Sequence, residues 1–300
     1  MDDILVVGSL NMDLVVRAPR FPAPGETLSG EDLALIPGGK GANQAVAASR
    51  LGAKVSMVGR VGSDVFGQAL LDNLAKNKVD SSKVQRDTAA TGTAMIVVDA
   101  RGQNSIVLSP GANGKVTPDD ALDLPDARIL ILQFEIPSEA VMQAAQQARK
   151  KGMKVIVNPA PARMVSSELL KLVDILVPNE TELSLLTGQP VSDGASVDAA
   201  ARKLIEQGAG MVVVTRGEQG VSAVSANDVQ VVPAFHVDVV DTTAAGDAFI
   251  AGLAVSLAEN KSTLEALKFA SACGALAVTK FGAQTSLPTR EEVDQFLRDK

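Results

Sequence analysis

The chain has 300 residues, of which 46% are hydrophobic, and it carries a formal net charge of −7 at pH 7. This length permits one large α/β domain or two smaller ones. The negative charge, without a long Lys/Arg cluster, argues against nucleic acid or an anionic membrane as the main partner.

Two reactive residue types occur only once each, which narrows the chemistry further. Cys273 is the one cysteine, so no internal disulfide can form, and His236 is the one histidine. A His-based triad and a His-rich metal site are therefore disfavoured. We expect Cys273 to be a small packing residue in a helix, and His236 to be structural because the alternating residues around it resemble a strand.

The N-terminus predicts a first strand rather than a targeting signal. Met1-Asp2-Asp3 leads directly into the apolar run Ile4–Val7, without the basic start and cleavage site of a signal peptide. Apolar stretches elsewhere, such as Ile250–Ala258, are too short to span a bilayer. We therefore expect a cytoplasmic protein with no membrane partner.

Apolar runs typical of strands alternate with helical patterns along the chain. The expected strands are Ile4–Gly8, Val55–Gly59, Ile129–Leu132, Val155–Asn158, Ile175–Pro178 and Met211–Thr215. The expected helices are Gly41–Leu51, Val65–Asn77, Ser138–Lys150, Glu180–Thr187, Ala195–Gln207, Ala245–Glu259, Thr263–Lys280 and Thr289–Arg298. This alternation predicts an α/β fold in which helices cover both faces of a mostly parallel sheet.

Two regions break this alternation. Asp13–Pro37 and Thr91–Ser109 show no helical period, and Pro and Gly separate their strand-like pieces. We expect them to pair as a small sheet outside the core, which is a candidate lid. Because no interdomain linker is visible, we expect residues 1–300 to form a single domain.

The most informative segment is the turn Asp241–Ala245, which runs into Gly246 and Asp247 at the start of a helix. Its small side chains leave the NH groups of the helix N-terminus free to stabilise negative charge on a transferring phosphoryl group. Asp247, in the first turn, is then a candidate general base. The alternative is that Asp247 only complements the helix dipole.

A second glycine-rich turn, Pro37–Ala45, also opens a helix. Its glycines permit a ligand to approach the backbone, or they simply form a common helix entry. Lys40 is not followed by Ser or Thr, and the spacing of a P-loop is missing, so a Walker ATPase is excluded.

Polar residues follow three further strands. Asn11 and Asp13 could hold neighbouring sugar hydroxyls, or form an ordinary Asx turn. Glu182 could orient water around Mg²⁺, or complement a helix dipole. The segment Thr215–Gly220 could cradle a nucleotide, or form a hairpin turn.

Taken together and in this order, these segments resemble the ribokinase (PfkB) carbohydrate kinase family over essentially the whole chain. The matching segments are Asn11–Asp13, Gly38–Ala45, Asn158–Ala162, Pro178–Glu182 and Asp241–Asp247. The resemblance implies an αβα sandwich with a small β-sheet lid that closes over the sugar and often forms a homodimer interface. It also implies ATP-dependent phosphorylation of D-ribose at O5.

The resemblance also assigns roles by position, with Asp247 on the catalytic base. The sugar-binding positions are Asn11, Met12, Asp13, Gly39, Lys40, Gly41, Ala42, Asn43, Glu135 and Asp247. The ATP-binding positions are Asn179, Thr215, Arg216, Gly217, Glu218, Gln219, Gly220, Gly246, Asp247 and Ser271. A monovalent cation, usually K⁺, is implied at Asp241, Thr243, Ala277, Lys280, Gly282 and Ser286, and an indirect Mg²⁺ contact at Glu182.

Two positions depart from the family pattern. Ala244 stands where the family commonly has Gly, and its methyl group is tolerated if φ is negative. Ser271 stands where His or Asn is also familiar, so no specific side-chain contact to adenine is implied.

Three other functions remain open. The first is a kinase for deoxyribose, fructose, a nucleoside or another sugar alcohol on the same scaffold. The second is a non-catalytic binding protein that responds to sugar or nucleotide, against which the intact Asp247 and glycine turns count. The third is a nicotinamide-dependent oxidoreductase, which the absence of G-x-G-x-x-G after the first strand disfavours.

Overall fold

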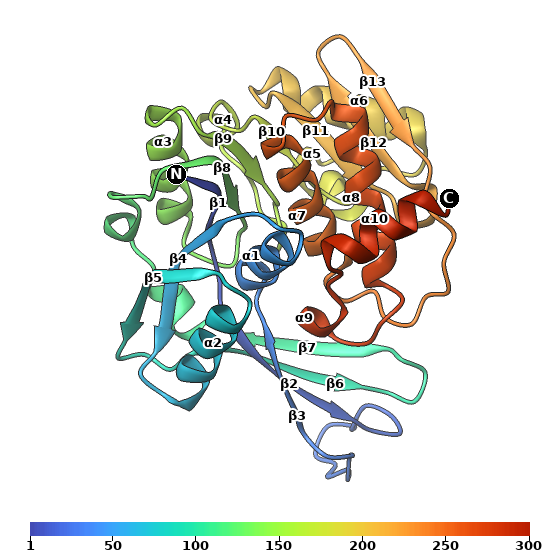
Figure 1. Ribbon diagram of the computed structural model, residues 1–300. Coiled ribbons are helices and arrows are strands. Elements are labelled where there is room, and N and C mark those ends of the chain that lie inside the picture. Colours follow the sequence, from blue (N-terminus) through green and yellow to red (C-terminus); the bar gives the residue numbers. More distant parts are fainter.

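A nine-stranded sheet runs through the centre of the fold, in the order β13-β12-β11-β10-β9-β8-β1-β4-β5 (Figure 1). The computed structural model describes residues 1–300. Neighbouring strands are parallel from β5 to β11, whereas β12 and β13 are antiparallel. The bounds are β1 (Asp2–Val7), β4 (Val55–Gly62), β5 (Asp80–Asp87), β8 (Ala127–Leu132), β9 (Lys154–Val157), β10 (Ile175–Leu176), β11 (Met211–Thr215), β12 (Val221–Ser225) and β13 (Val229–Val232).

Helices pack on both faces of this sheet. The bounds are α1 (Lys40–Arg50), α2 (Val65–Lys76), α3 (Ser138–Lys150), α4 (Ser167–Leu170), α5 (Glu180–Thr187), α6 (Gly194–Glu206), α7 (Ala245–Ala258), α8 (Thr263–Ala277), α9 (Ala283–Ser286) and α10 (Arg290–Arg298). Three 3₁₀ turns are η1 (Gly111–Lys115), η2 (Pro118–Ala121) and η3 (Gly217–Gln219). No helix is both long enough and apolar enough to cross a bilayer.

Side-chain alternation along β1 explains the two layers. Ile4 and Val6 belong to a core shared with α1, α7 and α8, whereas Leu5 and Val7 belong to a core shared with α3, α5 and α6. Successive residues of a strand point to opposite faces, so a continuous apolar run fills both cores. The predicted αβα sandwich is confirmed.

The edge strands differ from the sequence prediction. Three strands, β5, β12 and β13, were not predicted, and the expectation that His236 lies in a strand is wrong. Val232 pairs with Val221, the first residue of β12, so the residues after Val232 have no partner strand. Pro233 also lacks an NH group to extend the ladder. His236 is exposed in this irregular segment.

A separate four-stranded sheet lies beside the main body, in the order β3-β2-β6-β7 (Figure 1). Its strands are β2 (Asn11–Arg17), β3 (Ala34–Gly38), β6 (Gly92–Val98) and β7 (Asn104–Ser109), so the two regions predicted to form a small sheet do pair. Leu14 is opposite Leu35 and Met95, and Met95 is opposite Val107. These residues form an apolar row across one face.

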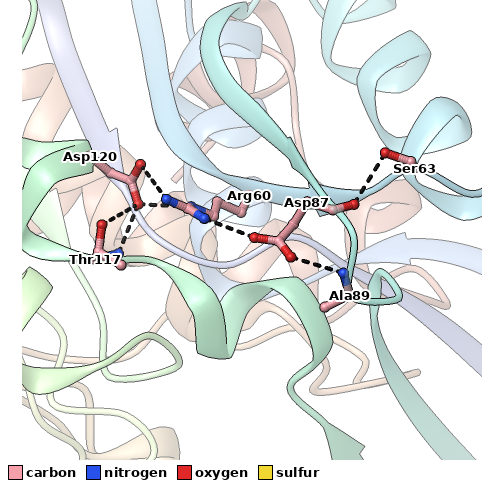
Figure 2. Close-up of polar contacts among 6 residues, drawn as sticks. All are labelled: Arg60, Ser63, Asp87, Ala89, Thr117 and Asp120. Carbon is pink, nitrogen blue, oxygen red and sulfur yellow. Dashed lines mark hydrogen bonds and ion pairs between the residues drawn. The ribbon is translucent and has the colours of Figure 1, made fainter.

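A network of charges fixes the point where the chain leaves the main body for β6. Arg60 donates to Asp87 at 2.8 Å and, through two nitrogens, to Asp120 at 2.9 and 3.0 Å (Figure 2). Asp87 also accepts from the Ala89 NH, and Asp120 from the Thr117 NH. The network therefore joins β4, the end of β5 and the start of η2.

Replacing Arg60 by Met would leave two carboxylates facing each other, and the Asp120 side chain is only 2% exposed. We expect Arg60→Met to lower the thermal unfolding midpoint by several degrees, because a partly buried charge loses its partner. A matched control is Lys83→Met, since Lys83 pairs with the well-exposed Asp123. Equal midpoints for the two variants would contradict this view of the network.

Candidate active site

A cavity of about 200 Å³ lies at the carboxyl ends of the central strands. Asn158 follows β9, Val177 follows β10 and Thr215 ends β11, so three adjacent strands contribute to its wall. This edge of an open α/β sheet is where ligands usually bind. Six predicted site residues line the same cavity: Lys40, Asn179, Glu182, Thr215, Gly246 and Asp247.

Asp247 is buried in the first turn of α7, with 6% of its surface exposed. Its Oδ2 accepts from Asn43 Nδ2 at 2.9 Å, and its Oδ1 accepts from Gln44 Nε2 at 2.8 Å. Burial raises the pKa of Asp247, although the Lys40 ammonium and the two amide donors partly offset that rise. The carboxylate is thus held in one orientation at the edge of the cavity.

The N-terminus of α7 faces the cavity next to Asp247. Apart from its chain neighbours and the backbone of α7 itself, no heavy atom lies within 4 Å of the position that a Gly246 Cβ would occupy, so the backbone there is open to a ligand. NH groups in the first turn of a helix have no intrahelical acceptor and favour anions. The arrangement can stabilise negative charge directly beside a carboxylate.

Ala244 has an unexpected backbone conformation. Its φ is +60°, which is left-handed, so the negative φ at which the methyl group would be tolerated is not found. An L-residue with a Cβ in this region costs about 1 kcal/mol. Ala244 therefore adopts at some cost the turn that a glycine forms freely, and the helix start keeps its place in the cavity wall.

Lys40, at the start of α1, lies among carboxylates. Burial disfavours its charged form, but the surrounding carboxylates outweigh burial and raise its pKa; they belong to Asp247, Glu135 and Glu182. The backbone NH of Lys40 also donates to Glu135 Oε2 at 3.1 Å. The positive charge of Lys40 offsets a locally acidic site.

A second cavity, of about 400 Å³, opens between the small sheet and the main body. Asn11 and Glu135 line it together with Asn113, Phe134 and Arg163. Asp13 is two residues from Asn11 on the same face of β2, and burial, followed by the charges of Glu135 and Asp247, raises its pKa to about 7. Predicted sugar-binding residues thus line both cavities, with Lys40 and Asp247 in the first and Asn11 and Glu135 in the second.

Two predicted sugar-binding residues point elsewhere. Met12 and Ala42 are buried in the hydrophobic core, so only their backbone could contact a ligand. Gly39 has a φ of +88°, and a Cβ there would lie 2.7 Å from the Asn11 backbone nitrogen. Glycine at this position lets α1 start against β2.

Asn113 is a site residue that the sequence did not reveal. Its amide accepts from the Leu10 NH at 2.9 Å, and donates to the Leu10 carbonyl at 2.9 Å and to Asn11 Oδ1 at 2.7 Å. It thereby orients the Asn11 amide with its NH₂ group free. A lone Asn in Gly-Ala-Asn, about a hundred residues along the chain, gives no sequence signal for this contact.

On the predicted nucleotide side, Asn179 and Glu182 form a reciprocal capping box at the start of α5. Glu182 therefore does interact with the helix end, and it also lines the cavity. The segment Thr215–Gly220 connects the antiparallel strands β11 and β12, as a hairpin connection would. Only Thr215 of this segment lines the cavity, and Ser271, on α8, lines neither cavity.

Three of the six predicted cation-binding residues, Asp241, Thr243 and Gly282, are joined by hydrogen bonds. Asp241 accepts from the Thr243 NH at 2.9 Å and from its hydroxyl at 2.7 Å, and its other oxygen accepts from the Gly282 NH at 2.9 Å. The Val278 carbonyl accepts from the Asp241 NH at 3.2 Å. Carboxylate, hydroxyl and carbonyl oxygens thus gather here, a donor set that suits a hard cation.

Comparison with known proteins agrees with this geometry. The model of the pfkB family carbohydrate kinases matches residues 1–290. The chain belongs to this family. A ribokinase from Haemophilus influenzae is 43% identical over 299 residues, covering 98% of each chain. A deoxyribokinase from Salmonella typhi is 38% identical over 301 residues, again covering 98% of each.

A solved structure supports the same family at the level of the fold. The ribokinase of Arabidopsis thaliana, complexed with ribose and ATP, superposes with a TM-score of 0.93 at 36% identity and covers 99% of each chain. The family resemblance seen in the sequence is therefore confirmed over the whole chain.

Proposed function

We propose that this protein transfers the γ-phosphate of ATP to O5 of D-ribose, giving D-ribose 5-phosphate and ADP. The observation that carries the proposal is the buried carboxylate of Asp247, fixed by two amides beside the open N-terminus of α7. Similarity to ribokinases over nearly the whole chain supports ribose as the substrate. We also propose a cytoplasmic location, where ATP is supplied.

In this proposal, the sugar lies between β2 and the main body. Asn11 and Glu135 line the second cavity, Asp13 lies on the same face of β2 as Asn11, and the Asn43 Oδ1 is buried without a hydrogen-bond partner. A sugar hydroxyl would satisfy that oxygen, since an unpaired buried acceptor costs about 1–3 kcal/mol. The small sheet, with bounds of about 13–37 and 91–109, would close over the sugar and exclude water.

Asp247 would remove the proton from O5 as the hydroxyl attacks the γ-phosphate in line. The first-turn NH groups of α7 would stabilise the negative charge that develops on the phosphoryl oxygens. Asn179, Thr215–Gly220, Gly246 and Ser271 are the proposed ATP-binding residues. Among them, Asn179, Thr215 and Gly246 line the cavity next to Asp247.

Two cations fit the residues present. Glu182, with one oxygen engaged in the capping box, would hold water around Mg²⁺. The oxygens of six residues would hold K⁺: Asp241, Thr243, Ala277, Lys280, Gly282 and Ser286. When bound, these ions supply positive charge that offsets the charge of the phosphates.

We expect ADP release to depend on ribose when a panel of ribose, deoxyribose, fructose and a nucleoside is tested, and to increase with K⁺ over Na⁺.

The variant Asp247→Asn should bind ribose but lose about 10³-fold in kcat, because it lacks the general base. The control is Asp72→Asn, at an exposed site on α2. Near-normal turnover by Asp247→Asn would refute the mechanism, whereas wild-type binding without any sugar-dependent turnover would favour a non-catalytic binding protein.

The raised pKa of Asp13 predicts a pH dependence of sugar binding. Its pKa of about 7 means that the carboxylate form, which accepts hydrogen bonds from hydroxyls, is lost as the pH falls below 7. We expect the KM for ribose to rise about tenfold between about pH 8 and pH 6, with the KM for ATP as an internal control. Asp13→Asn should remove this dependence. A dependence that persists in that variant would assign it to another group.

We further propose that the protein is a homodimer through the small sheet. Leu35, Met95 and Val107 lie in one row and are 52%, 49% and 58% exposed. A solvent-facing apolar row on a sheet is typical of an interaction surface, and the same row on a second copy would cover it. Val107→Lys should shift the mass measured by light scattering toward that of a monomer. Leu185→Lys, at an exposed site on α5, is the control, and an unchanged mass for Val107→Lys would contradict the interface.

A further inference from the structure

A line of buried amide side chains leads from the central sheet to Asp247. Gln133, just after β8, donates from Nε2 to Gln44 Oε1 at 2.6 Å. Gln44, in α1, donates from Nε2 to Asp247 Oδ1 at 2.8 Å and to Asn158 Oδ1 at 3.4 Å. Gln44 and Gln133 are both 0% exposed. This line, Gln133–Gln44–Asp247, is called the amide relay below.

Each member of the amide relay fixes the orientation of the next. A side-chain amide has one accepting oxygen and one donating NH₂ group, so a donor from Gln133 turns the NH₂ of Gln44 toward Asp247. Asn158 donates to the Val177 carbonyl at 3.2 Å, which leaves Asn158 Oδ1 to accept the second hydrogen of Gln44. All the polar capacity of the Gln44 NH₂ group is thereby used.

The amide relay leaves one buried atom, Gln133 Oε1, without a hydrogen-bond partner. Gln133 Oε1 is buried and accepts no hydrogen bond, which is unfavourable for a polar atom. A Cβ on Gly8 would lie 2.0 Å from that oxygen, so the strand exit accommodates Gln133 only because residue 8 is glycine. The glycine at position 8 and the Gln133 side chain thus together hold the Gln44 amide in one orientation.

Gln44 differs from its neighbour Asn43 in what it can do. Asn43 also donates to Asp247, but its Oδ1 is buried and accepts nothing from the protein, which leaves it to accept from a substrate in the proposed function. Like Asn43, Gln44 lines neither cavity, but unlike Asn43 it uses both ends of its amide within the protein. Its shorter contact with the site is the one to Asp247 at 2.8 Å, whereas its contact with the cavity-lining Asn158 is 3.4 Å long, so its influence on a reaction would pass chiefly through Asp247.

We propose that Gln44, held by Gln133, is a positioning residue that keeps the Asp247 carboxylate ionised and directed at the substrate hydroxyl. This inference rests on the proposed kinase function. Charged groups around Asp247 come from α1 (Lys40), β2 (Asp13), the segment after β8 (Glu135) and α5 (Glu182). Three of these four are acids, so neutral donors such as Gln44 matter for keeping Asp247 charged.

The test is a pH–rate profile of Gln44→Met, which keeps the side-chain length but cannot donate. We expect the acidic limb of kcat to move up by about one pH unit, because a donor to the charged form is lost. At neutral pH, kcat should fall about tenfold or more, while the KM for ribose changes less than about threefold. Gln230→Met, on the edge strand β13, is the matched control and should leave the profile unchanged.

A second variant separates positioning from folding. Gln133→Met should shift the limb in the same direction by less, and the double variant should shift it no more than Gln44→Met alone, because both act along one line. If Gln44→Met does not fold, the Gln133→Met profile decides. A lowered unfolding midpoint with an unmoved acidic limb would overturn the proposal and leave only a structural role.

A direct titration distinguishes failure of this inference from failure of the proposed function. The Asp247 carboxyl can be followed by ¹³C NMR in wild type and Gln44→Met without any turnover. A higher pKa in the variant supports the amide relay even if no sugar is phosphorylated. An equal pKa overturns it even if ribose is the substrate.

Discussion

The burial of one carboxylate organises this structure. Asp247 lies almost out of contact with water, and an ionised acid there is stable only where donors and a cation surround it. Lys40, Asn43 and Gln44 supply these from the first two turns of α1. The glycine turn before α1 and the strained turn before α7 therefore have the same effect, because together they bring the starts of two helices to the Asp247 carboxylate.

Close approach of backbone to polar side chains recurs around the site. A Cβ on Gly92 would lie 2.2 Å from Asn113 Nδ2, and one on Gly38 would lie within 3 Å of the Asp13 carboxylate. Both glycines belong to strands of the small sheet, at the ends nearest the main body. The small sheet is thus fitted to the polar groups that it carries, and a movement of the sheet would change the surroundings of Asp13 and Asn11 together.

The sequence predicted the features that depend on local pattern. Continuous apolar runs such as Ile4–Val7 identified the central strands, and the small-residue turn before Asp247 identified the helix start. Patterns that depend on distant partners were missed. The short edge strands β12 and β13 gave no clear signal, and the alternation around His236 suggested a strand where no partner strand exists. Gln133 and Asn113 act through contacts about a hundred residues away, and the left-handed φ of Ala244 is set by the surrounding fold.

The side chains of β2 point alternately to its two faces, and this limits which insertions and deletions the strand can tolerate. Asn11 lines the second cavity and the buried Asp13 lies on the same face of β2, while Met12 and Leu14, on the other face, pack against hydrophobic side chains. A deletion of one residue within β2 would exchange the two sets, placing methionine toward the site and carboxylate in the core. The strand could still pair through its backbone, so such an exchange of the two faces would preserve the sheet and abolish the site. Viable length changes in this strand should therefore come in pairs of residues.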